Sequence, residues 1–159
     1  MYRHHYETNR FLEASPADVF AELDDHERLS VHMMRSSAMM AGASMRLELD
    51  AAKGRKTGSK MTLRGRVLGL PLNVEEVVIE YTPPLRKVWE TVGTPRLLVI
   101  GRYRMGFELE PGDHGSRLTI FIDYDPPVGF GNRISRLLGP AYARWCTTNM
   151  ADGVARHFG

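Results

Sequence analysis

The chain has 159 residues, enough for one domain with one substantial hydrophobic core, so we expect a single domain over residues 1–159. Hydrophobic residues make up 43% and charged residues 25% of the chain, as in ordinary globular proteins, and the formal net charge of +2 is too small to indicate a nucleic-acid-binding protein. The sequence has no apolar run of about 18 residues, no signal peptide at its start and only one cysteine, so we expect a cytoplasmic protein without disulfides.

The first part of the chain predicts a strand followed by two short helices. Residues 4–13 mix aromatic and polar side chains with strand-forming propensity. Ser15 is a favourable N-cap and Pro16 suits the first helical position, so residues 16–23 should form a helix. The two aspartates that follow offer a second cap, which predicts another short helix over residues 26–34.

Alternation of apolar and polar residues then recurs along the chain and predicts six further strands. They occupy residues 43–50, 61–67, 73–81, 87–92, 97–109 and 117–125. Turns rich in glycine and proline separate these strands. After the last strand, residues 131–157 predict one helix, which would be about 38 Å long at a rise of about 1.5 Å per residue.

This order of elements predicts an α+β fold. Consecutive hairpins form an antiparallel sheet, and a twisted sheet of seven strands curls. The long terminal helix is the only element able to cover the concave face. Because a helix and a curved sheet cannot interdigitate everywhere, we expect a space between them.

Three segments carry a resemblance to a known superfamily: SPADVFA at residues 15–21, EYTPPLRKVWE at residues 80–90, and the long terminal helix. With this order of elements, almost the whole chain resembles the START/Bet v1-like helix-grip superfamily (SRPBCC), which includes polyketide cyclase/dehydrase and lipid-transport families. The resemblance implies a curved seven-stranded antiparallel sheet wrapped around a long C-terminal helix, with two short helices after the first strand. It also implies a hydrophobic cavity that binds lipids, polyketides or other small apolar molecules, in some members with chemistry.

Strand parity and a helical wheel predict which side chains face that cavity. The wheel places one broad apolar face of the long helix toward the sheet, made of Leu138, Tyr142, Trp145, Cys146, Asn149, Met150, Gly153 and His157, and it places Arg133, Arg136, Arg144 and Ala151 opposite. The expected ligand-binding residues are Met61, Leu63, Val77, Ile79, Trp89, Tyr103, Met105, Phe107, Tyr124, Tyr142, Trp145 and Asn149. Trp89 lies in a strand too short to fix its parity. The polar groups of Tyr142 and Asn149 could contact a ligand or bond to neighbouring protein atoms.

The segment YARWCTTNM, residues 142–150, contains the lone cysteine and suggests a Cys-His-Asn nucleophile. On a continuous helix, however, Cys146 and His157 stand about 16 Å apart along the axis, whereas a nucleophile and its base must lie within about 3.2 Å. A histidine from elsewhere, such as His4, His26 or His32, could still approach the thiol. The alternative is that Cys146 is a small buried hydrophobic residue.

Glu75 is the candidate acid/base residue, because it shares strand parity with Val77 and Ile79. A carboxyl group buried in this way would have a raised pKa and could transfer protons. At a frayed strand end, the same residue would simply be solvated. Asp123 lies on the polar parity of the last strand and should point outward, so a paired acid/base constellation is missing.

The turn KGRKTGSK, residues 53–60, concentrates four positive charges. It lacks the spacing of a phosphate-binding loop and should connect two strands. It is either a solvated hairpin tip or a site for transient contact with an anionic membrane or an acidic ligand head. No aromatic residues are interleaved with these charges, so nucleic acid is not an expected partner.

The methionines and the histidines remain to be interpreted. Met33, Met34, Met39, Met40 and Met45 cluster between the second helix and the second strand, either as core filling or as an adaptable surface near the cavity entrance. The six histidines lack metal-ligand spacing, so we expect neither a metal nor another cofactor.

The sequence thus supports three hypotheses. The main one is binding or transport of a small hydrophobic ligand between the sheet and the terminal helix. The second is a cyclase/dehydratase- or hydrolase-type enzyme that polarises such a ligand through Tyr103, Glu75 or Asn149. The third is a module that binds a partner or membrane through residues 53–60.

Overall fold

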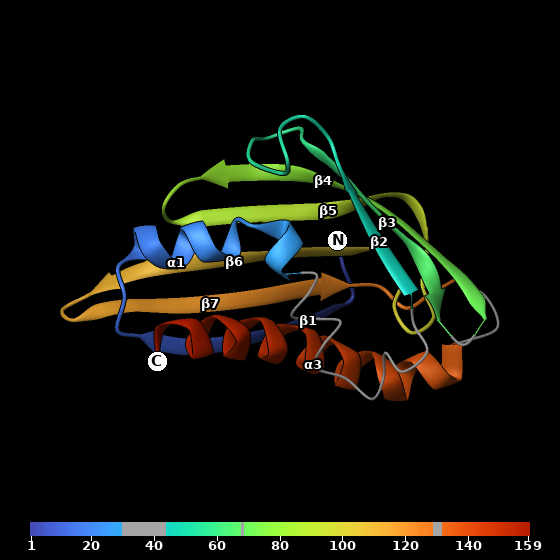
Figure 1. Ribbon diagram of the computed structural model, residues 1–159. Helices are drawn as coiled ribbons and strands as arrows, with labels where there is room; N and C mark the ends of the chain where they lie inside the picture. The colour runs from blue at the N-terminus through green and yellow to red at the C-terminus, as the bar shows by residue number, and fades with distance from the viewer. Residues whose placement is uncertain (30–43, 68, 129–131) are drawn as a thin grey trace.

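The computed structural model describes residues 1–29, 44–67, 69–128 and 132–159, and it contains one seven-stranded antiparallel sheet with helices on one side (Figure 1). The strands are β1 (His4–Leu12), β2 (Ser44–Leu49), β3 (Lys60–Val67), β4 (Leu70–Thr82), β5 (Arg86–Arg96), β6 (Tyr103–Gly112) and β7 (Gly115–Tyr124). Their order in the sheet is β1-β7-β6-β5-β4-β3-β2. The helices are α1 (Pro16–Leu23) and α3 (Asn132–Phe158). The helix-grip architecture is confirmed, and none of the described helices is long and apolar enough to cross a bilayer.

The N-terminal caps form as the sequence predicts. The Ser15 hydroxyl accepts a hydrogen bond of 3.2 Å from the Asp18 amide, and Pro16 occupies the start of α1. The Asp25 carboxylate accepts hydrogen bonds of 3.1 and 3.2 Å from the Glu27 and Arg28 amides, and the chain is helical from His26 to Leu29. The rest of the second predicted helix lies outside the described residues, as do four of the five clustered methionines.

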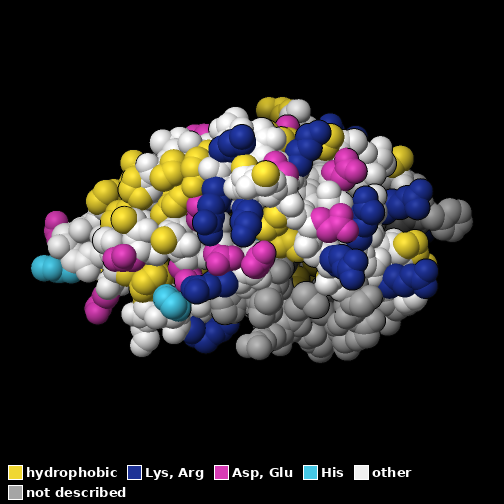
Figure 2. Space-filling view, turned by 45° about the horizontal axis from the view of Figure 1, so that its top comes forward, with side chains coloured by type: hydrophobic (Ala, Val, Ile, Leu, Met, Phe, Trp, Pro, Cys, Tyr) yellow, Lys and Arg dark blue, Asp and Glu magenta, His cyan; other side chains and the backbone are white. Residues whose placement is uncertain are grey.

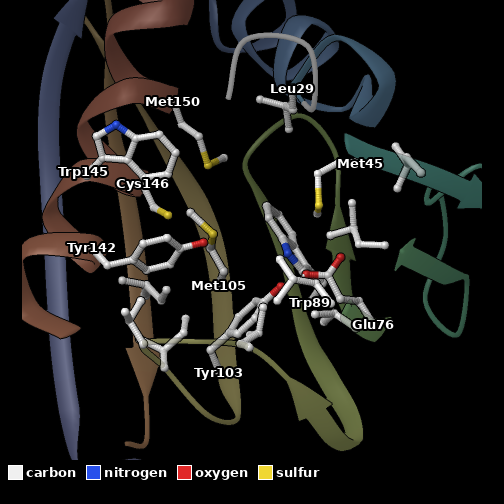
Figure 3. Close-up of a pocket in the computed structure, with 18 of the residues that line it drawn as sticks. Leu29, Met45, Glu76, Trp89, Tyr103, Met105, Tyr142, Trp145, Cys146 and Met150 are labelled. Carbon is white, nitrogen blue, oxygen red and sulfur yellow. The ribbon is translucent and has the colours of Figure 1, made fainter. Parts of the chain in front are cut away.

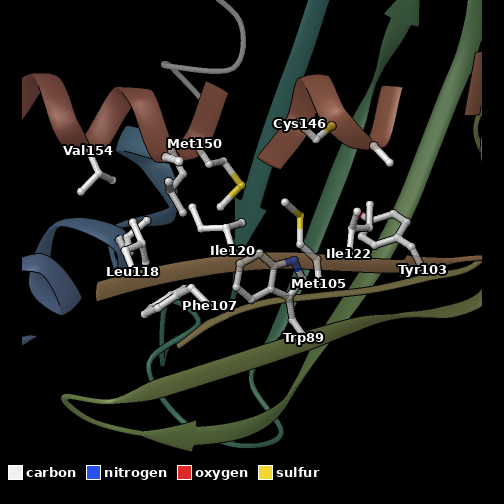
Figure 4. Close-up of a cluster of buried hydrophobic side chains, with 14 of the residues drawn as sticks. Trp89, Tyr103, Met105, Phe107, Leu118, Ile120, Ile122, Cys146, Met150 and Val154 are labelled. Carbon is white, nitrogen blue, oxygen red and sulfur yellow. The ribbon is translucent and has the colours of Figure 1, made fainter. Parts of the chain in front are cut away.

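The core lies between the sheet and α3 (Figure 4). The predicted inward parity is confirmed on β6 and β7, whose inward side chains are all buried: Tyr103, Met105, Phe107, Leu109, Leu118, Ile120, Ile122 and Tyr124. On the helix side, Met150 and Val154 complete this layer. The first strand pairs with the last, with Tyr6 opposite Ile122, so β1 forms one edge of the sheet beside β7.

The strand predicted over residues 97–109 is wrong at its start, because β6 begins only at Tyr103 and β5 extends to Arg96. Between them the chain forms a loop that leaves the sheet. The Gly101 amide donates to the Asp125 carbonyl at 2.7 Å, and a Cβ at Gly101 would lie 2.7 Å from the Pro126 carbonyl oxygen. This close backbone contact replaces strand pairing at the end of the loop.

The predicted parity of β4 is also wrong. Val78 pairs with Trp89, but Glu80 pairs with Val88, so Ile79 is an extra residue in a β-bulge. The bulge reverses the parity, and Tyr81 faces inward while Val77 and Ile79 do not; Ile79 is 38% exposed. The buried side chains before the bulge are Leu72, Val74, Glu76 and Val78, and Glu75 is exposed.

The terminal helix has the predicted extent but is rotated from the predicted wheel. Ala151, expected on the outer side, is completely buried, whereas Leu138 and His157 are exposed. The Thr147 hydroxyl lies 2.8 Å from the Thr8 hydroxyl of β1. The small side chains of Ala143, Thr147 and Ala151 are completely buried, which lets α3 lie close to the sheet. The larger Tyr142 and Trp145 are only partly buried at the side of the helix.

Candidate ligand-binding cavity

A cavity of about 270 Å³ lies between α3 and the concave face of the sheet. Figure 3 shows Tyr142 and Trp145 of α3 on one side and Glu76, Trp89 and Tyr103 of the sheet on the other. The loop between β5 and β6 closes part of the wall with four consecutive apolar residues, 97–100. The volume is roughly twice the ~150 Å³ of an apolar cavity that binds benzene, so a molecule with two fused rings fits.

Glu76 provides the one carboxyl group in the described wall of the cavity. Its side chain accepts hydrogen bonds from the Tyr103 hydroxyl and from the Trp89 indole. Burial raises the pKa of Glu76 from 4.5 to about 7, although these two hydrogen bonds act in the opposite direction. Near neutral pH, Glu76 can therefore donate a proton or accept one inside an apolar space.

The thiol of Cys146 faces the same cavity but is not an activated nucleophile. Burial raises the pKa of Cys146 to about 12, with only partial compensation from its hydrogen bond with Tyr142. His157 is exposed near the C-terminal end of α3, and its imidazole lies 3.7 Å from the carboxylate of Glu22 in α1. Because α3 is one continuous helix from Asn132 to Phe158, Cys146 and His157 remain about three turns apart. Within the described residues no histidine hydrogen-bonds to the thiol, and His32 lies outside them.

His26 forms another polar part of the wall. Its ring packs edge-on against the indole of Trp89, with ring centroids 5.3 Å apart. Burial, together with the nearby charges of Lys87 and Arg55, lowers the pKa of His26 to about 3, so the imidazole is neutral. Its buried Nε2 has no hydrogen-bond partner in the described part of the chain. His26 therefore contributes a neutral aromatic ring rather than a cation.

Gly54 makes room for that ring. It has φ of +75°, and a Cβ there would lie 2.7 Å from the His26 Cδ2 atom. Gly58 in the same turn has φ of +86°, with nothing within 4 Å of an added Cβ. We expect Gly58→Ala to lower the free energy of unfolding by about 1 kcal/mol through backbone strain alone. Gly54→Ala should cost about 1 kcal/mol more because His26 must move. Urea unfolding measures both, and equal losses would contradict the contact.

The family model for polyketide cyclase / dehydrase and lipid transport matches residues 3–157. The chain belongs to this family. The resemblance to the SRPBCC superfamily seen in the sequence is thereby confirmed. Among curated proteins, none matches the chain by sequence.

Solved structures show the same fold as this member of the cyclase/dehydrase and lipid-transport family. A protein of Thermus thermophilus aligns with a TM-score of 0.72 and 15% identity, covering 98% of this chain and 97% of that one. Norcoclaurine synthase of Thalictrum flavum aligns with a TM-score of 0.66 and 15% identity over 97% and 92% of the two chains. The di-domain ARO/CYC protein of the steffimycin biosynthetic pathway gives 0.68 and 11% identity, over 97% of this chain and 50% of that one. At these identities the likeness establishes the fold alone.

In this family member, half of the predicted ligand-binding residues line the cavity: Leu63, Trp89, Tyr103, Met105, Tyr142 and Trp145. Met61, Phe107 and Tyr124 are buried in the core outside its wall. Asn149 also lies outside the wall, and its buried amide nitrogen has no partner in the described residues. Val77 and Ile79 are placed on the outer face by the bulge in β4. That any of these residues binds a ligand stays a prediction.

Sequence reasoning missed Glu76, although it had found its neighbour. Glu75, the predicted acid/base residue, is exposed on the outer face, and the inward carboxyl group is one residue later. The pair of glutamates in an otherwise apolar strand was the available signal, but the alternation alone could not say which of them faces inward. Met45 is the one member of the methionine cluster within the described residues, and it lines the cavity.

A second buried polar cluster, also missed, lies beside the cavity. Lys87 of β5 has no exposed side-chain surface, and its ammonium lies 2.5 Å from the Asp24 carboxylate that follows α1. The other Asp24 oxygen accepts a hydrogen bond of 2.8 Å from the Tyr81 hydroxyl. The cluster holds the end of α1 against β4 and β5. Because the Lys87 ammonium forms an ion pair with Asp24, it is not available to bind an anionic group of a ligand.

The basic turn 53–60 connects β2 and β3, as predicted. Lys53 and Lys56 are exposed at its tip, and Arg55 lies 3.8 Å from Asp24. As expected, Asp123 points outward, where its carboxylate binds His5 and Arg104. No group of three or more metal-ligating side chains is found in the described residues.

Proposed function

We propose that the protein binds a small, largely apolar molecule in the cavity between α3 and the sheet. The observation that supports this most directly is the cavity itself, of about 270 Å³, lined by aliphatic and aromatic side chains with very few polar atoms. The family to which the chain belongs is described by cyclase, dehydrase and lipid-transport functions, and the size favours a ligand of about two rings.

The expected result for this function is loss of affinity when the aromatic wall is truncated. We expect Trp145→Ala to weaken the binding of 2-naphthol roughly tenfold, because the indole covers one side of the cavity. Phe11→Ala is the matched control, since Phe11 is exposed on β1 away from the cavity. Fluorescence titration measures both affinities, and native mass spectrometry of the purified protein tests for a bound apolar molecule. Equal affinities for both variants would contradict the proposed cavity site.

Glu76 favours a second candidate function, an enzyme that moves a proton next to a carbonyl group. An ionised Glu76 could remove a proton from the carbon beside a ketone, leaving an enolate, and then return the proton to the same carbon. Cyclase and dehydratase reactions begin with such a step. Tyr103 and Trp89, which hydrogen-bond to Glu76, would orient the carboxylate.

Exchange of deuterium into the two-ring ketone 2-tetralone separates these functions. An enzyme should accelerate exchange beside the carbonyl in D2O, and Glu76→Gln should reduce that acceleration by about a hundredfold or more while the ketone still binds. A carrier should bind the ketone without accelerating exchange. Exchange that Glu76→Gln leaves unchanged would exclude Glu76 as the base. NMR follows both the exchange and the binding.

We further propose that residues 1–159 act as one domain in the cytoplasm. The one thiol, Cys146, is buried and free, which suits a reducing compartment.

A further inference from the structure

A row of arginines crosses the outer face of the sheet at one end. Arg46 of β2 stands opposite Arg64 of β3, Arg64 stands opposite Asn73 of β4, and Asn73 stands opposite Arg96 of β5. Arg66 lies two residues further along β3 on the same face. All four arginines are exposed. The row therefore presents guanidinium groups from β2, β3 and β5, with the Asn73 amide of β4 between them.

These four arginines form no ion pair within the described part of the chain. The remaining stretches, 30–43, 68 and 129–131, contain no aspartate or glutamate in the sequence. By contrast, Arg102 and Arg104 on the neighbouring part of the sheet bind Asp125 and Asp123. Like charges placed directly opposite each other in a sheet are destabilising. The arginine row is thus a charged surface that the fold itself does not neutralise.

Exposed aliphatic side chains lie at the same end of the sheet. Leu70 is 52% exposed, Leu98 is 42% exposed and Val128 is 99% exposed. All three line one surface groove together with Arg96. Figure 2 shows Lys and Arg side chains gathered toward the right end of the molecule, with hydrophobic and some acidic side chains between them. Exposed apolar residues with a polar rim are typical of interaction surfaces.

This end of the molecule also adjoins the cavity. Leu72, Leu97 and Leu98 line both the surface groove and the cavity wall. Gly139 of α3 packs near the Val99 carbonyl, so the first turns of α3 border the same end (Figure 1). The exposed Leu137 lies in those turns. A partner seated here would contact the outer side of the cavity wall.

We propose that this end of the molecule, formed by Arg46, Arg64, Arg66, Arg96, Leu70 and Leu98, docks on an anionic membrane surface. The guanidinium groups match lipid phosphates and carboxylates, and the exposed leucines can enter the boundary between headgroups and acyl chains. Nucleic acid fits less well, because single strands stack on aromatic rings and these six residues include none. The docking face lies at the opposite end of the β2–β3 hairpin from the basic turn 53–60.

Co-sedimentation with vesicles tests this surface without any bound ligand, so the result does not depend on the proposed cavity function. The native protein should bind vesicles of phosphatidylcholine with phosphatidylserine, should not bind phosphatidylcholine alone, and should be released by salt. The variant Arg46→Gln, Arg64→Gln, Arg96→Gln should lose affinity about a hundredfold, roughly fivefold for each arginine. Leu70→Ser should lose affinity severalfold without a change in charge.

Lys53→Gln, Lys56→Gln, Lys60→Gln is the matched control, because it removes the same charge from the basic turn. It should keep most of the affinity, and both triple variants should melt at or near the native temperature. Loss of binding in the lysine variant but not in the arginine variant would assign docking to the turn instead. Failure of the native protein to bind anionic vesicles, or binding to DNA or an acidic protein in their place, would overturn the proposal.

Discussion

Replacing Lys87 with methionine is expected to lower the free energy of unfolding by about 3 to 5 kcal/mol. The ammonium group is fully buried and lies 2.5 Å from the Asp24 carboxylate. Burial lowers the pKa of Lys87, and the hydrogen bond to Asp24 opposes that shift, so the ion pair is what keeps the charge inside the protein. Without the ammonium, Asp24 remains buried and charged with only the Tyr81 hydroxyl and the more distant Arg55 nearby. Urea unfolding followed by tryptophan fluorescence measures the loss.

Arg86→Met is the matched control for this prediction. Arg86 precedes Lys87 in β5 and pairs with Glu80 and Glu108, but its side chain is partly exposed. Because solvent screens such pairs, Arg86→Met should cost at most about 1 kcal/mol. In the double variant Lys87→Met, Asp24→Asn, the buried charge is gone and much of the lost stability should return. Similar losses of unfolding free energy for Lys87→Met and Arg86→Met would show that the buried ion pair contributes no more to stability than the exposed one.

The sequence was sufficient for the fold because local signals and global architecture agree. Ser15 and Pro16 define the start of α1, and the alternation in β2, β3, β6 and β7 places the right side chains inward. The order of elements then leaves one arrangement, a sheet gripping α3. Where local patterns are this consistent, they predict tertiary structure well.

The sequence was insufficient where both parities of an element are apolar. In β4, Val77, Val78 and Ile79 are adjacent, so hydrophobicity cannot locate the bulge that reverses the parity. The helical wheel had a similar weakness, since it favours large apolar residues, whereas α3 packs closest through small ones such as Ala143 and Ala151. In both elements, the predicted inward face differs from the observed one by about one residue along the chain.

The polar interior depends on contacts between distant parts of the chain. Asp24 and Lys87 are 63 residues apart, and Glu76 meets Tyr103 across two intervening connections. No local pattern predicts such pairs, and a lysine in an alternating strand is usually solvent-exposed. Only the structure shows that the chain buries one compensated charge beside the cavity and one uncompensated carboxyl group in its wall.

Glu76→Gln is expected to stabilise the protein at neutral and alkaline pH. In the folded protein the Glu76 carboxyl keeps its proton up to a pKa of about 7, whereas its ordinary pKa is 4.5. Unfolding in this range therefore releases a proton, so the free energy of unfolding of the native protein falls as the pH rises from 4.5 to 7. The interval corresponds to about 3 kcal/mol at ~1.4 kcal/mol per pKa unit. Glutamine keeps the acceptor oxygen and does not titrate.

The native protein and the Glu76→Gln variant should thus have similar stability below pH 4.5, and the variant should be more stable by up to about 3 kcal/mol above pH 7. Denaturation at a series of pH values measures the difference in unfolding free energy between the two proteins. The contributions of all other titrating groups are the same in both and cancel. Glu75→Gln is the matched control, because it makes the same change one residue earlier, on the exposed outer face of β4. Tyr103→Phe should move the native transition to higher pH, since the hydroxyl stabilises the carboxylate. A constant difference across the pH range would mean that Glu76 has the same pKa in the folded and the unfolded protein, and it would remove the basis for proton transfer near neutral pH in the cavity.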